Sequence, residues 1–359
     1  MIEYILLGIA AFWAVLTSIV RKFNLEERGV TIIPLILVMV RTKKFLHIID
    51  SLSQKAKSFW NAYSVLGVLV CVAGIPTALG FFVWNAYKVL SFSPEATPVI
   101  PVIPGVTIKI SWGLIISIII IFFVHEFSHG IVARREGISL KSVGVLLLVV
   151  IPGAFVEPDE EEMKKASPLS RIKVYSAGSL GNFIVAAVFL IFLLQIPYIP
   201  DGILVYETIP GTPAEDTLLE GAVIYQIDNT DVLTLDEFSE EMTAYHKGDT
   251  ILFDTSKGTV SITLAEHPDI PGQGYIGIRP REHTEHFFIL DVFSWISMLN
   301  LSIALFNLFP ISRVLDGGKI TDEILNLYFS EPTSRKLATL FGGLAMVILI
   351  INLLSNVML

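Results

Sequence analysis

The sequence predicts a polytopic α-helical membrane protein with about six transmembrane helices, a re-entrant β-like hairpin and a small extracytoplasmic α/β domain. Hydrophobic residues make up 53% of the 359 residues and charged residues only 16%, whereas soluble domains carry about 25% charge. Apolar runs of spanning length recur along the chain. Residues 201–282 differ from the rest, because they hold sixteen Asp and Glu but four Lys and Arg, a local charge of −12.

The predicted transmembrane helices are apolar runs close to the roughly 20 residues that a span requires. The first run has no small-residue cleavage site, so we expect an uncleaved helix rather than a signal peptide. The six predicted spans are Met1–Val20, Ser64–Trp84, Ile110–Ala133, Ile172–Ile196, His286–Pro310 and Leu337–Leu354.

Three further segments are not predicted to span. Val30–Val40 is apolar but short, and Pro34 interrupts it. Arg41–Trp60 places lysines among apolar residues at near-helical spacing, which predicts a helix at the membrane surface. Val143–Val156 has fourteen residues with Pro152-Gly153 inside it, which favours bends over a continuous helix.

The segment 143–156 is therefore predicted to form a re-entrant hairpin, with a short buried helix as the alternative. A strand edge of this hairpin, or of Val30–Val40, is expected to pair with an unwound substrate segment. Pro152 and Gly153 are accordingly candidate substrate-binding residues.

The distribution of basic residues predicts the topology. They concentrate in segments 21–60, 134–141, 164–173 and 313–336, which the positive-inside rule places in the cytoplasm. Both termini and the acidic domain are then outside. We expect three regions, namely a membrane region at 1–198, an extracytoplasmic domain at 199–283 and a second membrane region at 284–359.

The composition also excludes some kinds of site. Cys71 is the single cysteine of the chain, which excludes an intrachain disulfide or a thiolate metal cluster. Nothing in the sequence resembles a nucleic-acid-binding patch.

The chemistry begins with an HExxH motif, His125-Glu126-Phe-Ser-His129. On a helix, positions i and i+4 lie about 40° apart, so both imidazoles can bind one zinc ion. Glu126 lies beside that point and can act as base to a zinc-bound water. Ionisable residues at the end of an apolar helix are costly, which favours a functional role for them.

A third ligand must come from another segment, and Asp316 is the best candidate. It lies nine residues after Asn307, on the opposite side of an unbroken helix. Pro310 breaks that helix, so both residues can turn toward one site. The alternative is that Asp316 is only a helix cap or a loop carboxylate.

The acidic domain shows β-like alternation, with strands expected around Ile203–Val205, Ile224–Ile227, Ile251–Phe253 and Val260–Ile262 and short helices at Pro213–Asp216 and Leu235–Met242. The line GILVYETIPGTPAEDTLLEGAVIYQID resembles a PDZ domain of the bacterial protease type. An unrelated small α+β domain is the alternative.

Most of residues 110–320 resembles the site-2 protease family of intramembrane zinc metalloproteases. The motifs that carry the resemblance are, in order, the HExxH helix, the PGAF hairpin, the SAGSLGN helix ending at Asn182, the PDZ-like insert and the NxxP and LDG motifs at Asn307 and Asp316.

The resemblance implies that His125, His129 and Asp316 hold zinc, that Glu126 is the general base and that Asn307 lies near the substrate carbonyl. One departure is that five residues separate Pro310 from Asp316, where the family usually has four.

Asn182 is expected near the same site. It lies nine residues from Lys173, as His125 does from Arg134, so the two residues lie at a similar depth inside the cytoplasmic leaflet. Gly178 and Gly181 allow close packing of the fourth span against a neighbour. Asn182 is then either a substrate contact or an interhelical hydrogen-bond partner.

The function we expect is hydrolysis of peptide bonds within or near transmembrane segments of regulatory membrane proteins, with Zn²⁺ as cofactor. The PDZ-like domain is expected to bind a substrate ectodomain or a chain terminus. The alternative of an ion-coupled transporter or channel predicts inverted repeats, which the sequence lacks. A zinc protease of another membrane family would need a glutamate as third ligand. A binding protein with a dead site would not need an intact HExxH motif.

Overall fold

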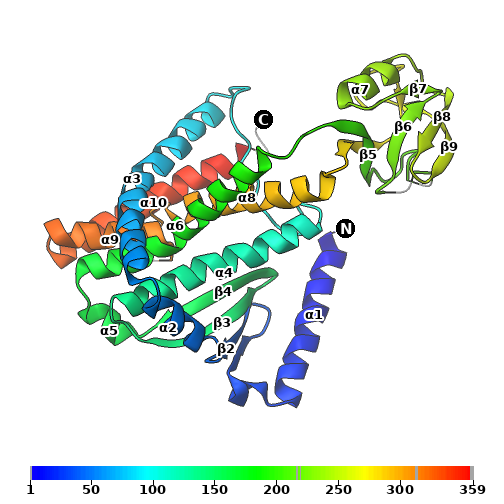
Figure 1. Ribbon diagram of the computed structural model, residues 1–359. Helices are drawn as coiled ribbons and strands as arrows, with labels where there is room; N and C mark the ends of the chain where they lie inside the picture. The colour runs from blue at the N-terminus through cyan, green and yellow to red at the C-terminus, as the bar shows by residue number, and fades with distance from the viewer. Residues whose placement is uncertain (1, 216, 219, 312–313, 356–359) are drawn as a thin grey trace. The chain divides into compact units, whose positions relative to one another are not determined.

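The structure is a computed structural model that describes residues 2–215, 217–218, 220–311 and 314–355, with side chains from Leu7 onward (Figure 1). The chain forms two compact units. The larger consists of residues 1–191 and 292–359, and the smaller runs from Phe192 to Asp291. The segment 199–283 that we expect to be the extracytoplasmic domain lies within the smaller unit.

Among the described residues, five helices are long and apolar enough to cross a membrane, and they coincide with five of the six predicted spans. They are α3 (Lys57–Leu90), α4 (Trp112–Arg135), α6 (Pro168–Leu193), α8 (Phe287–Asn307) and α10 (Glu331–Leu353). The first predicted span forms α1 (Ile2–Lys22), although Met1 and the side chains of residues 2–6 lie outside the described part.

The helix predicted over Arg41–Trp60 is shorter than expected. Helix α2 covers only Leu46–Gln54, and α3 begins at Lys57. The reason is that Arg41 and Thr42 belong to strand β2, where they pair with Gly144 and Val143. The remaining short helices of the larger unit are η1 (Leu25–Arg28), α5 (Glu160–Lys165) and α9 (Asp316–Tyr328).

Both short apolar segments form β-strands of one antiparallel sheet. Its order is β1 (Val30–Ile33), β2 (Leu37–Thr42), β3 (Leu140–Leu148) and β4 (Ile151–Pro158). The β-hairpin predicted at 143–156 is therefore present, and the alternative of a short buried helix is wrong, while its re-entry into the membrane stays a prediction. The pairing of β2 with β3 was not predicted from the sequence.

Gly144 permits this pairing. A Cβ at that position would overlap the carbonyl oxygen of Val40 on β2 and the ring of Phe155 on β4. Only a residue without a side chain allows both neighbouring strands to approach β3 there.

Strand β4 lies at an edge of the sheet, beside α4 (Figure 1). The two-residue turn Val149–Val150 makes Leu148 and Ile151 a hydrogen-bonded pair. Backbone groups alternate in direction along a strand, so those of Pro152, Ala154 and Val156 point away from β3. Pro152 fits this position because it has no N–H to leave unpaired.

The smaller unit contains a sheet in the order β12 (Ile278–Thr284), β5 (Pro200–Thr208), β6 (Val223–Ile227), β8 (Thr250–Thr255) and β9 (Gly258–Thr263), with β7 (Thr230–Asp231) paired to β6. A two-stranded sheet of β10 (Ala265–Glu266) and β11 (Gly274–Tyr275) and helix α7 (Leu235–Thr243) complete it. The strands expected from alternation are confirmed, and their alternate residues Ile203, Ile224, Ile251, Phe253 and Ile262 form the core.

The two helices predicted in this unit have different outcomes. Helix α7 is confirmed and begins with a capping box of Thr234 and Glu237. Hydrogen bonds from the backbone N–H groups of Leu233 and Thr234 lower the pKa of Glu237 below its ordinary value. The helix predicted at 213–216 is instead a turn in which Leu218 N donates to Ala214 O, and Asp216 lies outside the described residues.

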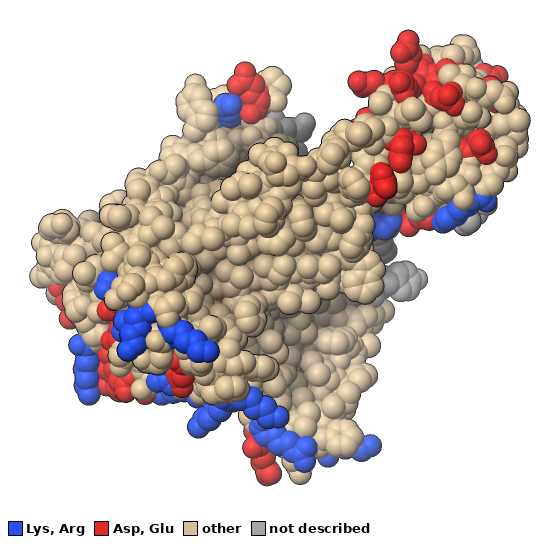
Figure 2. Space-filling model, viewed as in Figure 1, with Lys and Arg blue, Asp and Glu red and all other residues tan. Residues whose placement is uncertain are grey.

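The surface charge of each unit agrees with the distribution of charged residues along the chain. Figure 2 shows Asp and Glu side chains gathered over the smaller unit, and Lys and Arg side chains gathered on the larger unit. The acidic character of segment 201–282 is therefore a property of the surface of the smaller unit, as its apolar residues form the core.

Candidate metal centre

Three side chains that are far apart in sequence meet inside the larger unit. His125 and His129 come from α4, and Asp316 is the first residue of α9. The two Nε2 atoms lie 3.1 Å apart, and Asp316 Oδ2 lies 3.3 Å from His125 Nε2 and 3.1 Å from His129 Nε2. The structure thus brings together the three residues that the sequence proposed as ligands.

The environment of these atoms suits a cation. His129 Nδ1 lies 2.7 Å from the carbonyl oxygen of Val174, so it carries the proton and leaves the Nε2 lone pair facing the other two atoms. Asp316 Oδ2 is buried without a hydrogen-bond partner. Acceptor atoms that converge in a buried position repel one another unless a positive ion lies between them.

The spacing fits a tetrahedral metal. Zinc bonds to nitrogen and carboxylate oxygen measure about 2.0–2.2 Å, which places tetrahedral ligand atoms roughly 3.3–3.6 Å apart. The observed separations of 3.1 to 3.3 Å are close to this range. With three protein ligands, a fourth position is left for water or substrate, as in catalytic zinc sites.

Gly178 on α6 makes room for the imidazoles. A Cβ there would overlap His129 Nε2 and lie 2.7 Å from His125 Cε1. One turn further, a Cβ at Gly181 would lie 2.7 Å from Ser128 Oγ. The prediction that these two glycines allow close packing of the fourth span is confirmed.

The contact between the end of α8 and the start of α9 fixes Asp316. A Cβ at Gly317 would overlap the backbone of Leu308, so the chain segments can approach only at glycine. Lys319 Nζ lies 3.3 Å from Asp316 Oδ1, which leaves Oδ2 to face the histidines. The additional residue between Pro310 and Asp316 does not remove Asp316 from the cluster, although Ser312 and Arg313 lie outside the described residues.

Glu126 is adjacent to the cluster and joins it to the sheet. Its Oε2 accepts a hydrogen bond of 2.9 Å from the backbone N–H of Val156. Val156 is one of the β4 residues whose backbone groups face away from β3. The free edge of β4 therefore faces the carboxylate predicted to be the general base.

The other predicted site residues lie at different places. Asn182 is fully buried on α6, with Nδ2 at 3.1 Å from His125 Nδ1, so it makes an interhelical contact. Asn307 ends α8, and in the described part the hydrogen bonds and ion pairs of the three clustered residues do not include it. Pro152 and Gly153 lie on β4, where Gly153 packs against Leu146.

Two residues of the site were not identified from the sequence. Tyr63 on α3 donates to Ala177 O at 2.7 Å and can accept from Ser128 Oγ at 3.0 Å, and so joins α3 to both helices of the cluster. Lys319 follows Asp316 by three residues in α9, a helical spacing that would have indicated their contact.

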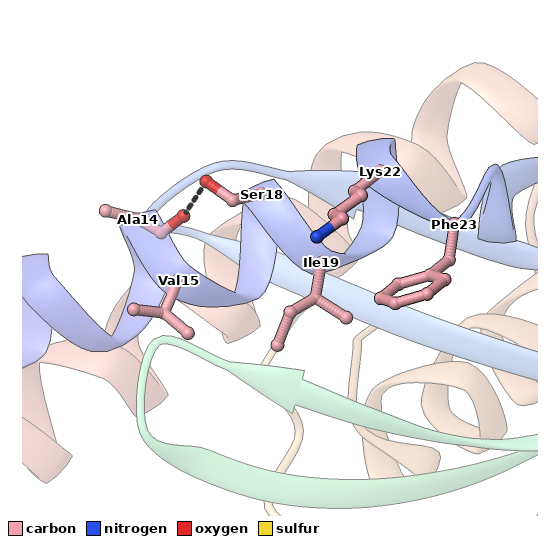
Figure 3. A pocket seen from close by; sticks show the side chains of 6 residues that line it. All are labelled: Ala14, Val15, Ser18, Ile19, Lys22 and Phe23. Atoms are coloured by element: carbon pink, nitrogen blue, oxygen red, sulfur yellow. Dashed lines mark hydrogen bonds between the residues drawn. The ribbon is translucent and has the colours of Figure 1, made fainter.

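The described part of the larger unit has a polar cavity and a cavity beside α1. One of about 280 Å³ is polar and is lined by Tyr175, Lys319, Asp322, Glu323 and Asn326, so Lys319 connects it to Asp316. The other, of about 360 Å³, lies along α1 and is lined by Ala14, Val15, Ser18, Ile19, Lys22 and Phe23 (Figure 3). It shares no lining residue with the metal cluster.

Comparison with known proteins places these features in a family. Residues 113–351 match the family model for peptidase family M50. An uncharacterised protein of Methanocaldococcus jannaschii is 31% identical over 88% of this chain and 83% of its own length.

Two further relatives match shorter segments. A membrane-bound transcription factor site-2 protease homologue of Arabidopsis thaliana is 27% identical over 35% of this chain and 26% of its own length. A candidate zinc metalloprotease of Clostridium perfringens is 25% identical over 43% of this chain and 53% of its own length.

The glycine at position 178 provides a test of the cluster. We expect Gly178→Ala to abolish stoichiometric metal binding, because the new methyl group would occupy the space of the His129 and His125 rings. Metal content of the purified protein measures this. Gly343→Ala on α10 is the matched control, since no atom lies within 4 Å of a Cβ there. Full metal content in the Gly178 variant would contradict the arrangement of α4 and α6.

Proposed function

Because the chain belongs to peptidase family M50, and is thus a membrane metalloprotease, we propose that it is a zinc endopeptidase of the site-2 type. It hydrolyses peptide bonds within or near the transmembrane segments of regulatory membrane proteins. The observation that carries the proposal is the convergence of His125, His129 and Asp316 beside Glu126 and the free edge of β4.

His125, His129 and Asp316 would hold the zinc ion. When bound, zinc polarises the scissile carbonyl and lowers the pKa of its water toward about 7. Lys319 holds the second oxygen of Asp316, so that the carboxylate presents a single oxygen to the site.

Glu126 would act as general base and then as general acid. Its Oε2 is held by Val156 N–H, which fixes the orientation of the carboxylate on the partly buried side chain. Glu126 takes a proton from the attacking water and transfers it to the nitrogen of the leaving amine as the peptide C–N bond breaks. Asn307 is proposed as a donor to the oxygen of the substrate carbonyl.

The substrate would bind as an added strand on β4. A transmembrane helix buries its carbonyls in its own hydrogen bonds, so it must unwind before attack. The outward N–H and C=O of Ala154 and the outward C=O of Val156 can replace those lost bonds. The N–H of Val156 is bonded to Glu126, and this contact places the new strand beside the base. Pro152 and Gly153 would then contact the substrate near the hairpin turn.

The PDZ-like domain would select substrates and take no part in the chemistry. Its strand β12 lies at the edge of the sheet, a position that can accept a peptide from a substrate ectodomain or a chain terminus. By the positive-inside rule, we place this domain and both termini outside the cytoplasm, and the hairpin as a re-entrant element of the membrane. No nucleic acid is expected as a partner.

The alternative of an ion-coupled transporter or channel explains the buried acidic and imidazole groups less well. Transport sites bind ions reversibly along a path, whereas here Glu126, beside the cluster, is also held against a strand edge. A strand edge beside the base has a use in proteolysis and none in transport.

We expect Glu126→Gln to reduce the rate of cleavage of a model membrane protein with one transmembrane helix at least 10²-fold, while zinc stays bound. The amide can still accept from Val156 N–H, but it cannot take a proton. Cleavage assays and metal analysis on the same sample measure both properties. Glu161→Gln, which changes a solvent-exposed carboxylate, is the control. Full activity of the Glu126 variant would refute the proposed role.

The free edge of β4 can be tested with proline. We expect Ala154→Pro to reduce kcat/KM for a helical substrate about tenfold or more, because it removes an outward N–H and obstructs a new strand. The pairing with β3 should survive, since that N–H faces away from β3. Ala154→Ser retains the N–H and serves as control. Equal activity of the two variants, with zinc bound in both, would show that the substrate does not pair with this edge.

The role of the PDZ-like domain can be tested by deletion. Pro200 and Thr284 are strand partners, so a short Gly-Ser linker can replace residues 201–283 without moving the flanking segments. We expect zinc to remain bound and the choice among substrates to broaden or shift, which competition between two substrates would measure. Loss of zinc from the shortened protein would show that the domain supports the site directly.

A further inference from the structure

The nitrogen and the oxygen of the Asn182 side-chain amide differ in their hydrogen bonding. The side chain is fully buried on α6. Its Nδ2 lies 3.1 Å from His125 Nδ1, whereas its Oδ1 is buried without a hydrogen-bond partner. A buried carbonyl oxygen without a partner is costly and calls for a physical explanation.

This orientation of the amide conflicts with metal binding by His125. Because Nδ2 is a donor, His125 Nδ1 must accept, and the imidazole proton then lies on Nε2. Nε2 is the atom that faces His129 Nε2 and Asp316 Oδ2. A metal ligand needs its lone pair at that position, so the proton must move to Nδ1 and requires an acceptor there.

A half-turn of the amide removes the conflict. The oxygen and the amino group of asparagine are similar in size, so exchanging them needs no backbone movement. Oδ1 then accepts from His125 Nδ1. The amino group takes the former place of Oδ1, where a water or the substrate would have to supply an acceptor.

We propose that Asn182 is a positioning residue whose Oδ1 accepts the Nδ1–H of His125 when the site holds its metal. The inference rests on the proposed function, because it assumes that His125 binds zinc. His129 needs no such partner, since the backbone carbonyl of Val174 already fixes its tautomer. The tautomer of His125 therefore depends on one side chain that can present either a donor or an acceptor.

Zinc affinity distinguishes this role from a direct substrate contact. We would measure the dissociation constant of the full-length protein in detergent by competition with a chelator. Asn182→Leu removes the acceptor at nearly constant volume and is expected to weaken zinc binding about 10- to 100-fold. Asn182→Asp offers only acceptors and is expected to bind zinc at least as tightly as the wild type.

Asn300→Leu is the matched control. Asn300 is also fully buried in a membrane helix, but its amide donates to Ile296 O of its own helix. Its replacement should leave zinc affinity unchanged. If Asn182→Leu does not fold, Asn182→Ala takes its place with the same expected weakening.

Two results would overturn the inference while leaving the proposed function intact. One is wild-type affinity in Asn182→Leu or Asn182→Ala. The other is an affinity of Asn182→Asp as low as that of the leucine variant, which would show that His125 needs a donor at this position. A wild-type protein that binds no zinc would instead refute the proposed function itself, and the inference with it.

Discussion

Three acceptor atoms, His125 Nε2, His129 Nε2 and Asp316 Oδ2, lie within 3.3 Å of one another in the buried part of the larger unit. When all three atoms present lone pairs, a cation between them is required, and the surrounding structure serves this requirement. Gly178 clears space for the imidazoles, and Gly317 allows α9 to approach α8 so that Asp316 reaches them. The packing of four helices thus depends on one small polar cluster.

Glu126, next to this cluster, connects it to the proposed substrate-binding edge through a single hydrogen bond. Glu126 accepts from Val156 on the free edge of β4, so this hydrogen bond fixes the position of the proposed base relative to the proposed docking edge. Pro152 lies on the same edge of β4 and has no N–H, so it interrupts the row of outward donors. This gap limits pairing of the edge with other strands. The proposed proton transfer by Glu126 on α4 and the proposed binding of an unwound substrate on β4 therefore take place side by side.

Local patterns in the sequence predicted much of this arrangement. The i, i+4 spacing placed both histidines on one face of a helix, and the length and Pro-Gly content of 143–156 indicated the hairpin. The pairing of Val40 with Val145 was not predictable, because a register between strands about a hundred residues apart leaves no local signal. For the same reason, the sequence showed neither the Tyr63 contacts nor the partner of Asn182, and it extended the surface helix into β2.

The most direct test of the account is the zinc content of the purified wild-type protein together with the zinc X-ray absorption spectrum. We expect one zinc ion per chain, bound by two imidazole nitrogens and a carboxylate oxygen at about 2.0–2.2 Å. The one cysteine of the chain, Cys71, is buried and donates to Ser176 O, so we expect no sulfur ligand. Absence of bound zinc, or a coordination shell that contains sulfur at about 2.3 Å, would contradict the proposed metal centre.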